Sequence, residues 1–214
     1  MFGNTVRIVS EKLSLVLRPA KESDIPRMTE GMSDWEVRKY LGVLGGVMEH
    51  NERDWIMKTS ESKDTVLWFI QPEGVDYAIG STALHRIDDP YNSCGSGFVI
   101  WDKTWWGKGV ASLAHIARTW FAARQLNRYT IISHVCTQNQ GSWRALERVG
   151  YIRTGLELRR KFVDGRFIDW YVYTWINPYT ISITYPEGLP QEYELGVQKA
   201  QTAILKGDEY IHFV

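Results

Sequence analysis

The chain has 214 residues, of which 44% are apolar and 23% charged, a composition typical of one globular domain with or without an appendage. Its 25 lysine and arginine residues balance its 25 aspartate and glutamate residues, which argues against a dedicated nucleic-acid-binding protein. The N-terminus lacks the apolar core of a signal peptide and no apolar run could span a bilayer, so we expect a cytoplasmic protein without a membrane partner.

Hydrophobic periodicity and turn residues predict alternating strands and helices along the chain. Strands are expected at residues 13–18, 65–71, 76–87, 95–101, 129–136, 157–163 and 166–175, and helices after Ser23 or Asp24, at 34–41, from Asn51 to 62, from Val110 onward and at 191–205. The glycines of residues 42–47 predict a flexible break. Cys94 and Cys136 have neither disulfide nor metal-ligand spacing, so we expect buried free thiols and no metal site.

The most informative stretch is residues 105–113, W-W-G-K-G-V-A-S-L, in which Gly107 and Gly109 precede apolar residues at helical spacing. The first turn of such a helix has unpaired backbone N–H groups and the positive end of the helix dipole, which together favour phosphate. From Lys103 to Leu146 the sequence has six Lys and Arg residues and no acidic residue. This pattern predicts a phosphate site, although the glycines alone would also fit a turn that only packs a helix on a sheet.

After the strand expected at 129–136 comes N-Q-G-S-W-R-A-L-E-R-V-G-Y, from Asn139 to Tyr151. The two motifs, in this order and one strand apart, resemble those of the GNAT acetyltransferase superfamily, and within it the branch that acetylates the N-termini of ribosomal proteins. The similarity extends from about residue 13 to about residue 175. It implies an α/β GNAT fold with a mixed twisted sheet and helices on both faces. Thr104 stands where the family often has Gln or Arg.

The resemblance implies acetyl-CoA as co-substrate, with its pyrophosphate on the glycine turn. In the family, the strand matching residues 95–101 separates from the next parallel strand, and its backbone binds the pantetheine arm and the thioester oxygen. By matching positions, the expected coenzyme-binding residues are Val99, Ile100, Trp106, Gly107, Lys108, Gly109, Val110, Ala111, Asn139 and Ser142. Asn139 would also fit as a helix N-cap, and Val99 and Ile100 as core residues.

Acetyl transfer to nitrogen requires a neutral amine, donors for the oxyanion and a proton for the leaving thiolate. Ser142 matches the family position near the coenzyme sulfur and is the first candidate for the acid, with Tyr151 as the second. His134 is a candidate base, and His85, Asp102 or an ordered water are alternatives.

The expected acceptor is a primary amine, and the resemblance favours a protein N-terminus. Trp35, Tyr40, His85 and Asp169 are the candidate acceptor-binding residues, with ordinary packing as the alternative for Trp35 and Tyr40 and a structural role as the alternative for His85. A small-molecule amine of the aminoglycoside or polyamine type is the alternative substrate. A non-catalytic acyl-CoA-binding or partner-binding module is the alternative class of protein.

We expect residues 1–176 to form the acetyltransferase domain and residues 177–214 an acidic, aromatic extension with a net charge of −3. Three roles fit this extension. It could be a lid that attracts a cationic amine to the acceptor side, an arm that docks on a second subunit of a homodimer, or a packed appendage.

Overall fold

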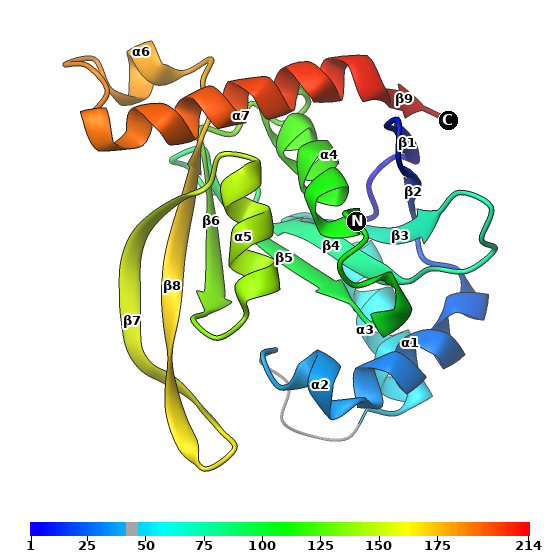
Figure 1. Cartoon of the computed structure of the whole chain (residues 1–214). Coiled ribbons are helices and arrows are strands. Elements are labelled where there is room, and N and C mark those ends of the chain that lie inside the picture. Colours follow the sequence, from blue (N-terminus) through cyan, green and yellow to red (C-terminus); the bar gives the residue numbers. More distant parts are fainter. Residues whose placement is uncertain (42–46) are drawn as a thin grey trace.

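A computed structural model describes residues 1–41 and 47–214 (Figure 1). Its centre is a nine-stranded sheet in the order β7-β8-β6-β5-β4-β3-β2-β1-β9. The strands are β1 (Val6–Val9), β2 (Ser14–Arg18), β3 (Thr65–Pro72), β4 (Gly80–His85), β5 (Ser93–Ile100), β6 (Thr130–Cys136), β7 (Ile152–Val163), β8 (Arg166–Ile176) and β9 (Ile211–Phe213). The helices are α1 (Ile25–Ser33), α2 (Trp35–Arg38), α3 (Glu49–Glu61), α4 (Val110–Arg124), α5 (Gln140–Arg148), α6 (Ile181–Thr184) and α7 (Gln191–Tyr210), with 3-10 turns at Glu22–Asp24 and Lys103–Trp105.

The sheet is mixed and covered by helices on both faces, which confirms the expected fold class. β5 and β6 run parallel, and the other neighbouring strand pairs of the described sheet run antiparallel. Helices α4, α5 and α7 contribute to the core on one face, and α1 and α2 to the core on the other (Figure 1). No helix within the described ranges is both long and apolar enough to cross a membrane.

Strand β3 shows how one strand serves both cores. Val66, Trp68 and Ile70 belong to the core under α4, whereas Leu67 and Phe69 belong to the core under α1 and α2. All five side chains are buried, because successive residues of a strand point to opposite faces of the sheet. The near-continuous apolar run in the sequence therefore follows from cover on both faces.

Strands β5 and β6 pair at only three positions, from Ser93 opposite Thr130 to Gly95 opposite Ile132. Beyond Gly95, β5 continues to Ile100 and stays paired with β4 on its other edge. β6 meanwhile pairs with β8 along its whole length. The second half of β5 thus has an edge that no strand of the described residues covers, and we call the space between this edge and β6 the slot.

Several element boundaries differ from the sequence patterns. β1 and β9 are not predicted, because strands of four and three residues carry too little alternation and form by pairing with each other. α3 begins at Glu49 after the N-cap Met48 rather than at Asn51, and the acidic Glu49 and Glu52 in its first turn complement the helix dipole. β7 begins earlier and α7 ends later than expected. The predicted break at 42–47 falls mainly on residues 42–46, outside the described residues.

The C-terminal segment is packed into the fold. α7 lies across α4 and its end brings β9 beside β1 (Figure 1). Gly207 permits this close approach, since a Cβ there would lie 2.6 Å from the Trp120 ring. The Asp208 carboxylate accepts a hydrogen bond from Trp120 Nε1 at 2.7 Å and pairs with Arg124 at 2.6 Å. Of the three roles expected for the extension, these contacts support the packed appendage.

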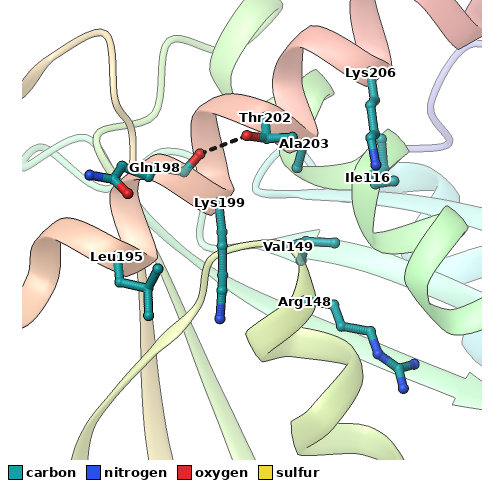
Figure 2. Close-up of a pocket in the computed structure, with 9 residues that line it drawn as sticks. All are labelled: Ile116, Arg148, Val149, Leu195, Gln198, Lys199, Thr202, Ala203 and Lys206. Carbon is teal, nitrogen blue, oxygen red and sulfur yellow. Dashed lines mark hydrogen bonds between the residues drawn. The ribbon is translucent and has the colours of Figure 1, made fainter.

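A hollow of about 280 Å³ lies between α7 and the helices α4 and α5 (Figure 2). Lys199 and Lys206 extend from one side of α7 along it. Its lining consists of Ile116, Arg148, Val149, Leu195, Gln198, Lys199, Thr202, Ala203 and Lys206. None of these residues was expected at the coenzyme or acceptor site, and the hollow lies where α7 packs beside α4 and α5.

Candidate active site

A second, larger cavity of about 510 Å³ lies where the slot opens, between the N-termini of α4 and α5 and the segment around α2. Its lining comes from four parts of the chain that are distant in sequence. These residues are Glu36, Val37, Lys39, Tyr40 and Leu41, then Phe98, Val99 and Ile100, then Trp106, Gly107 and Ala111, and finally Gln138, Asn139, Gln140, Gly141 and Ser142. We call this cavity the pocket.

The glycine turn forms one wall of the pocket. Gly107 and Gly109 have φ angles of +75° and +87°, a left-handed conformation that side chains disfavour. A Cβ at either position would meet no atom within 4 Å, so the requirement for glycine comes from the backbone and not from crowding. Gly109 is the N-cap of α4, and the first turn of α4 has no acidic residue. The turn therefore presents backbone donors and the positive end of the α4 dipole to an anion, as the sequence predicts.

The slot exposes the backbone of Phe98 and Ile100. The Asn92 carbonyl accepts a hydrogen bond from Tyr129 N–H on the β6 side, and Trp101 N–H donates to Ile79 on the β4 side. Because backbone groups alternate along a strand, even-numbered residues of β5 face β6 and odd-numbered residues face β4. The N–H groups of Phe98 and Ile100 thus point into the slot, whereas that of Val99 points to β4.

This orientation corrects part of the expected coenzyme set. Val99 contributes its side chain to the pocket, but its backbone is used in the sheet. The Ile100 carbonyl accepts a hydrogen bond from Trp106 Nε1 at 3.0 Å, so this oxygen already has a partner. The free donors of the slot are therefore the N–H groups of Phe98 and Ile100. Phe98 is a residue that sequence analysis missed.

The N-terminus of α5 forms the facing wall. Asn139 Oδ1 accepts a hydrogen bond from Ser142 N–H at 3.2 Å, so Asn139 is the N-cap of α5 and also lines the pocket. The Ser142 hydroxyl also lies at the pocket, and within the described residues it makes no hydrogen bond. A hydroxyl in this state is available to a ligand.

The third wall, formed by the end of α2 and the residues after it, is largely neutral. Glu36 is the one carboxylate among the described lining residues, and its Oε2 lies 2.6 Å from Lys39 Nζ. Tyr40 and Leu41 add an aromatic and an aliphatic surface. Lys161 Nζ from β7 donates to the carbonyl oxygens of Lys39 and Leu41, which ties this wall to the β7–β8 hairpin.

Comparison with known proteins identifies the family. The model of the GNAT acetyltransferase domain matches residues 14–152. The chain belongs to the GNAT acetyltransferase family. It is also 25% identical over 171 residues to YoaA, an uncharacterised N-acetyltransferase of Bacillus subtilis strain 168, across 77% of this chain and 94% of that relative.

Two solved structures have the same fold. RimJ of Mycobacterium smegmatis, in complex with CoA-disulfide, has a TM-score of 0.72 at 16% identity and covers 99% of this chain and 97% of that chain. Spermidine N-acetyltransferase of Vibrio cholerae, in complex with CoA and spermine, has a TM-score of 0.69 at 18% identity and covers 76% of this chain and 95% of that chain. The RimJ coverage includes residues 177–214, so the C-terminal segment has a counterpart in that structure.

As a GNAT enzyme, the protein is an acyl-CoA-dependent N-acetyltransferase with acetyl-CoA as co-substrate. The pocket fits this molecule at both ends. The positive-φ glycine turn at the start of α4 suits the pyrophosphate, and the free edge of β5 suits the extended pantetheine arm. The bound co-substrate would supply the activated acetyl group. No group of three or more His, Cys, Asp and Glu side chains in the described chain could hold a metal ion.

The structure brings most of the expected coenzyme residues together, but of the three expected catalytic residues only Ser142 lies at the pocket. Val99, Ile100, Trp106, Gly107, Ala111, Asn139 and Ser142 line the pocket, while Lys108, Gly109 and Val110 belong to the turn without lining it. Tyr151 is buried in the core under α4 and accepts a hydrogen bond from Arg118 Nη2 at 3.1 Å, and burial raises the pKa of its phenol. His134 lies outside the pocket, with its Nδ1 3.3 Å from Glu157 Oε2.

Of the four expected acceptor-binding residues, only one lies at the pocket. Tyr40 lines the pocket, whereas Trp35, one turn earlier, is 42% exposed and does not. His85 pairs with Gly95, at the opposite end of β5 from the pocket, and burial lowers the pKa of its imidazole. Asp169 accepts a hydrogen bond from Arg159 N–H at 2.8 Å, so it supports the bulge in β7. Asp102, an alternative base, accepts hydrogen bonds from Thr104 and stabilises the turn before Trp105.

Glu36 is a second residue that sequence analysis missed. It lies between the candidates Trp35 and Tyr40, but only the short α2 helix turns it toward the coenzyme side. No local pattern marks it, because only the tertiary fold places it at the same pocket as Phe98 and Ser142. Phe98 carries an equally weak signal, since a backbone donor leaves no trace in residue type.

We expect Ser142→Ala to lower kcat about tenfold while the Kd for acetyl-CoA changes little. Its hydroxyl has no partner within the described residues and would hydrogen-bond the leaving thiolate, an interaction that strengthens as charge develops. Steady-state kinetics and calorimetry measure the two constants. Ser182→Ala, at an exposed serine of α6, is the control. An unchanged kcat for Ser142→Ala would assign the proton to solvent.

Proposed function

We propose that this enzyme acetylates the N-terminal α-amine of a protein, with ribosomal proteins as the leading class. The observation that carries this proposal is the near-neutral acceptor wall. Its one described carboxylate, Glu36, is paired with Lys39, and the neighbouring Val37, Tyr40 and Leu41 are uncharged. A polyamine or an aminoglycoside carries several positive charges and would need several carboxylates, whereas an N-terminus carries one amine beside an extended backbone.

The chemistry of the amine supports the same choice. An α-amine has a pKa near ~8, so a useful fraction is neutral at cellular pH, whereas a lysine side chain near ~10.4 needs a stronger base. The described pocket has no histidine and one carboxylate, so it offers no strong base. This suits an α-amine, which is partly neutral without such a base, better than a lysine side chain. RimJ and the spermidine enzyme both share this fold, so the fold does not distinguish the two acceptors, and the charge of the wall is what supports the N-terminus.

The residues of the pocket would act as follows. The Phe98 and Ile100 N–H groups would donate to the carbonyl oxygen as it gains negative charge, an effect worth roughly 10²–10³ in rate for one donor. Glu36 would accept a hydrogen bond from the incoming amine, and water would take the proton that the amine nitrogen loses. Ser142 would donate to the sulfur as the carbon–sulfur bond breaks, so the proton lost by nitrogen is balanced by one gained at sulfur or by solvent.

An acceptor panel tests the proposal. We would compare a peptide with a free N-terminus, the same peptide with a blocked N-terminus and a lysine, spermidine and an aminoglycoside, with free thiol as the readout and mass spectrometry of the product. We expect kcat/KM to be highest for the free N-terminus. A higher kcat/KM for spermidine or the aminoglycoside would overturn the choice of acceptor, and turnover only at lysine would exclude the α-amine.

We expect Glu36→Gln to raise the acceptor KM about five- to tenfold without changing the Kd for acetyl-CoA. A hydrogen bond to a charged group is worth roughly 1.5–3 kcal/mol, and the partial exposure of Glu36 reduces this through solvent screening. Glu49→Gln, an exposed carboxylate of α3, is the matched control. An unchanged acceptor KM would remove Glu36 from amine binding.

The proposed acceptor sets the expected location and partners. Ribosomal proteins and acetyl-CoA meet in the cytoplasm, which is where we place the reaction. The partner is then a protein N-terminus, and neither a membrane nor a nucleic acid takes part directly. Light scattering tests whether the enzyme works as a monomer or as a homodimer.

A further inference from the structure

Arg118 is a buried charge that the steps above do not use. It lies on α4 and is 1% exposed. Within the described residues its guanidinium bonds only to neutral groups, and its Nε has no partner. Arginine is almost never fully buried without an anionic partner, because removing an unpaired charge from water is costly. The position of this charge therefore calls for a reason.

The contacts of Arg118 converge on one peptide of β5. Its Nη1 donates to the Gly97 carbonyl at 3.0 Å and to Thr82 Oγ1 at 3.2 Å, and its Nη2 donates to the Tyr151 hydroxyl at 3.1 Å. Thr82 Oγ1 in turn donates to the same Gly97 carbonyl at 3.3 Å. Thr82 and Tyr151 thus hold the guanidinium against the carbonyl of Gly97.

The peptide that receives this charge also carries a donor of the slot. The Gly97 carbonyl and the Phe98 N–H belong to one planar trans peptide, so they point in opposite directions. The carbonyl faces β4 and the guanidinium, and the N–H faces the slot. A cation bound to the carbonyl end of a peptide polarises it and makes its N–H a stronger donor.

Four neighbouring titratable groups of the described chain are neutral, although Arg86, Arg128 and Asp89 also act electrostatically on Cys94. Burial lowers the pKa of His115, also on α4, well below its ordinary value, and lowers that of His85 on β4. Burial raises the pKa of Cys94 on β5 to about 12 and raises that of Tyr151. These groups are neutral near pH 7, so Arg118 is the charged group among them. The His115 ring, 4.6 Å from the Phe98 ring, adds a packing contact that fixes Phe98.

We propose that Arg118 is a positioning residue for acetyl transfer, which orients and polarises the Gly97–Phe98 peptide so that Phe98 N–H stabilises the oxyanion. Its hydrogen bond to the carbonyl is charge-assisted and lies in a dry interior, where such bonds are strong. The effect acts on the thioester carbonyl and needs no particular acceptor amine. The inference therefore rests on acetyl-CoA as co-substrate and not on the identity of the acceptor.

The test compares Arg118→Met, which removes the charge, with Arg118→Lys, which keeps it. We expect Arg118→Met to lower kcat about tenfold, with the Kd for CoA itself within about twofold, because CoA has no thioester carbonyl. Infrared difference spectra of bound acetyl-CoA with carbon-13 at its acetyl carbonyl, without acceptor, provide a readout besides activity. The stretch should lie below that of free acetyl-CoA in the wild type, move to higher wavenumber in Arg118→Met and move less in Arg118→Lys.

Controls separate this role from simple packing. Thr82→Val removes one of the two groups that hold the guanidinium but keeps its charge, so the carbonyl stretch should move less than in Arg118→Met. Arg53→Met removes an exposed cation of α3 and should change neither readout. Equal losses of kcat and CoA affinity in Arg118→Met and Arg118→Lys, with an unshifted stretch, would overturn the proposal. If Arg118→Met does not fold, the wild-type enzyme still tests the proposal. A carbonyl stretching frequency of bound acetyl-CoA equal to that of free acetyl-CoA would overturn it.

Discussion

Gly109→Glu is expected to abolish the thermal stabilisation that acetyl-CoA gives the wild-type enzyme. At a ligand concentration 100 times the Kd, linkage predicts about 2.7 kcal/mol of stabilisation for a functional site. The substitution strains a backbone held at a φ of +87° and places a carboxylate at the N-terminus of α4, where the pyrophosphate is expected. Melting curves with and without acetyl-CoA measure the effect.

Gly74 provides a matched control for this substitution. It lies in the turn between β3 and β4 with a φ of +79°, and a Cβ there would also meet nothing within 4 Å. Gly74→Glu therefore carries a similar backbone strain and the same added charge, but at a turn that does not line the pocket. We expect it to melt somewhat earlier and to respond fully to acetyl-CoA. A folded Gly109→Glu variant with the same response would place the coenzyme elsewhere.

Truncation after Asn177 is expected to cost most of the stability of the protein. The removed segment includes the buried residues Ala200, Ala203, Ile204, Gly207 and Ile211. Burial of two isoleucines alone contributes roughly 3–6 kcal/mol, and loss of α7 also exposes Trp120 and one face of α4. Total stabilities are about 5–15 kcal/mol, so residues 1–177 should not melt cooperatively. Calorimetry and circular dichroism test this.

A pair of point substitutions tests the same contact in the full-length chain. Ile204 is fully buried, and its neighbour Leu205 on α7 is 53% exposed. We expect Ile204→Ala to lower the free energy of unfolding by about 2–5 kcal/mol and Leu205→Ala by less than about 0.5 kcal/mol. If the truncated chain instead folds with an unchanged melting temperature, the extension is a separate appendage on which the fold does not depend. A halved mass in light scattering would instead support the dimer arm.

The chemistry of the coenzyme site could be predicted because its signals are local. The left-handed turn at Gly107 and Gly109, the helix that follows and the N-cap Asn139 are each specified by a few neighbouring residues. The order of the strands between residues 65 and 176 and the position of α4 follow from periodicity in the same way. These features depend on backbone preferences and hydrogen bonds within a few residues, which a sequence pattern expresses directly.

The tertiary structure alone decided which groups meet at the pocket. The slot exists because β6 leaves β5 after Gly95 to pair with β8, and this long-range pairing turns the Phe98 N–H into a free donor. Glu36 reaches the same pocket from a short helix distant in sequence, whereas the expected Tyr151 is buried against Arg118. The sequence, through its resemblance to the GNAT family, indicated the fold class and acetyl-CoA as co-substrate, and its local pattern predicted the glycine turn that begins α4. The placement of the tail, of the pocket wall around α2 and of the buried charge depends on non-local packing, for which residue type at one position carries no signal.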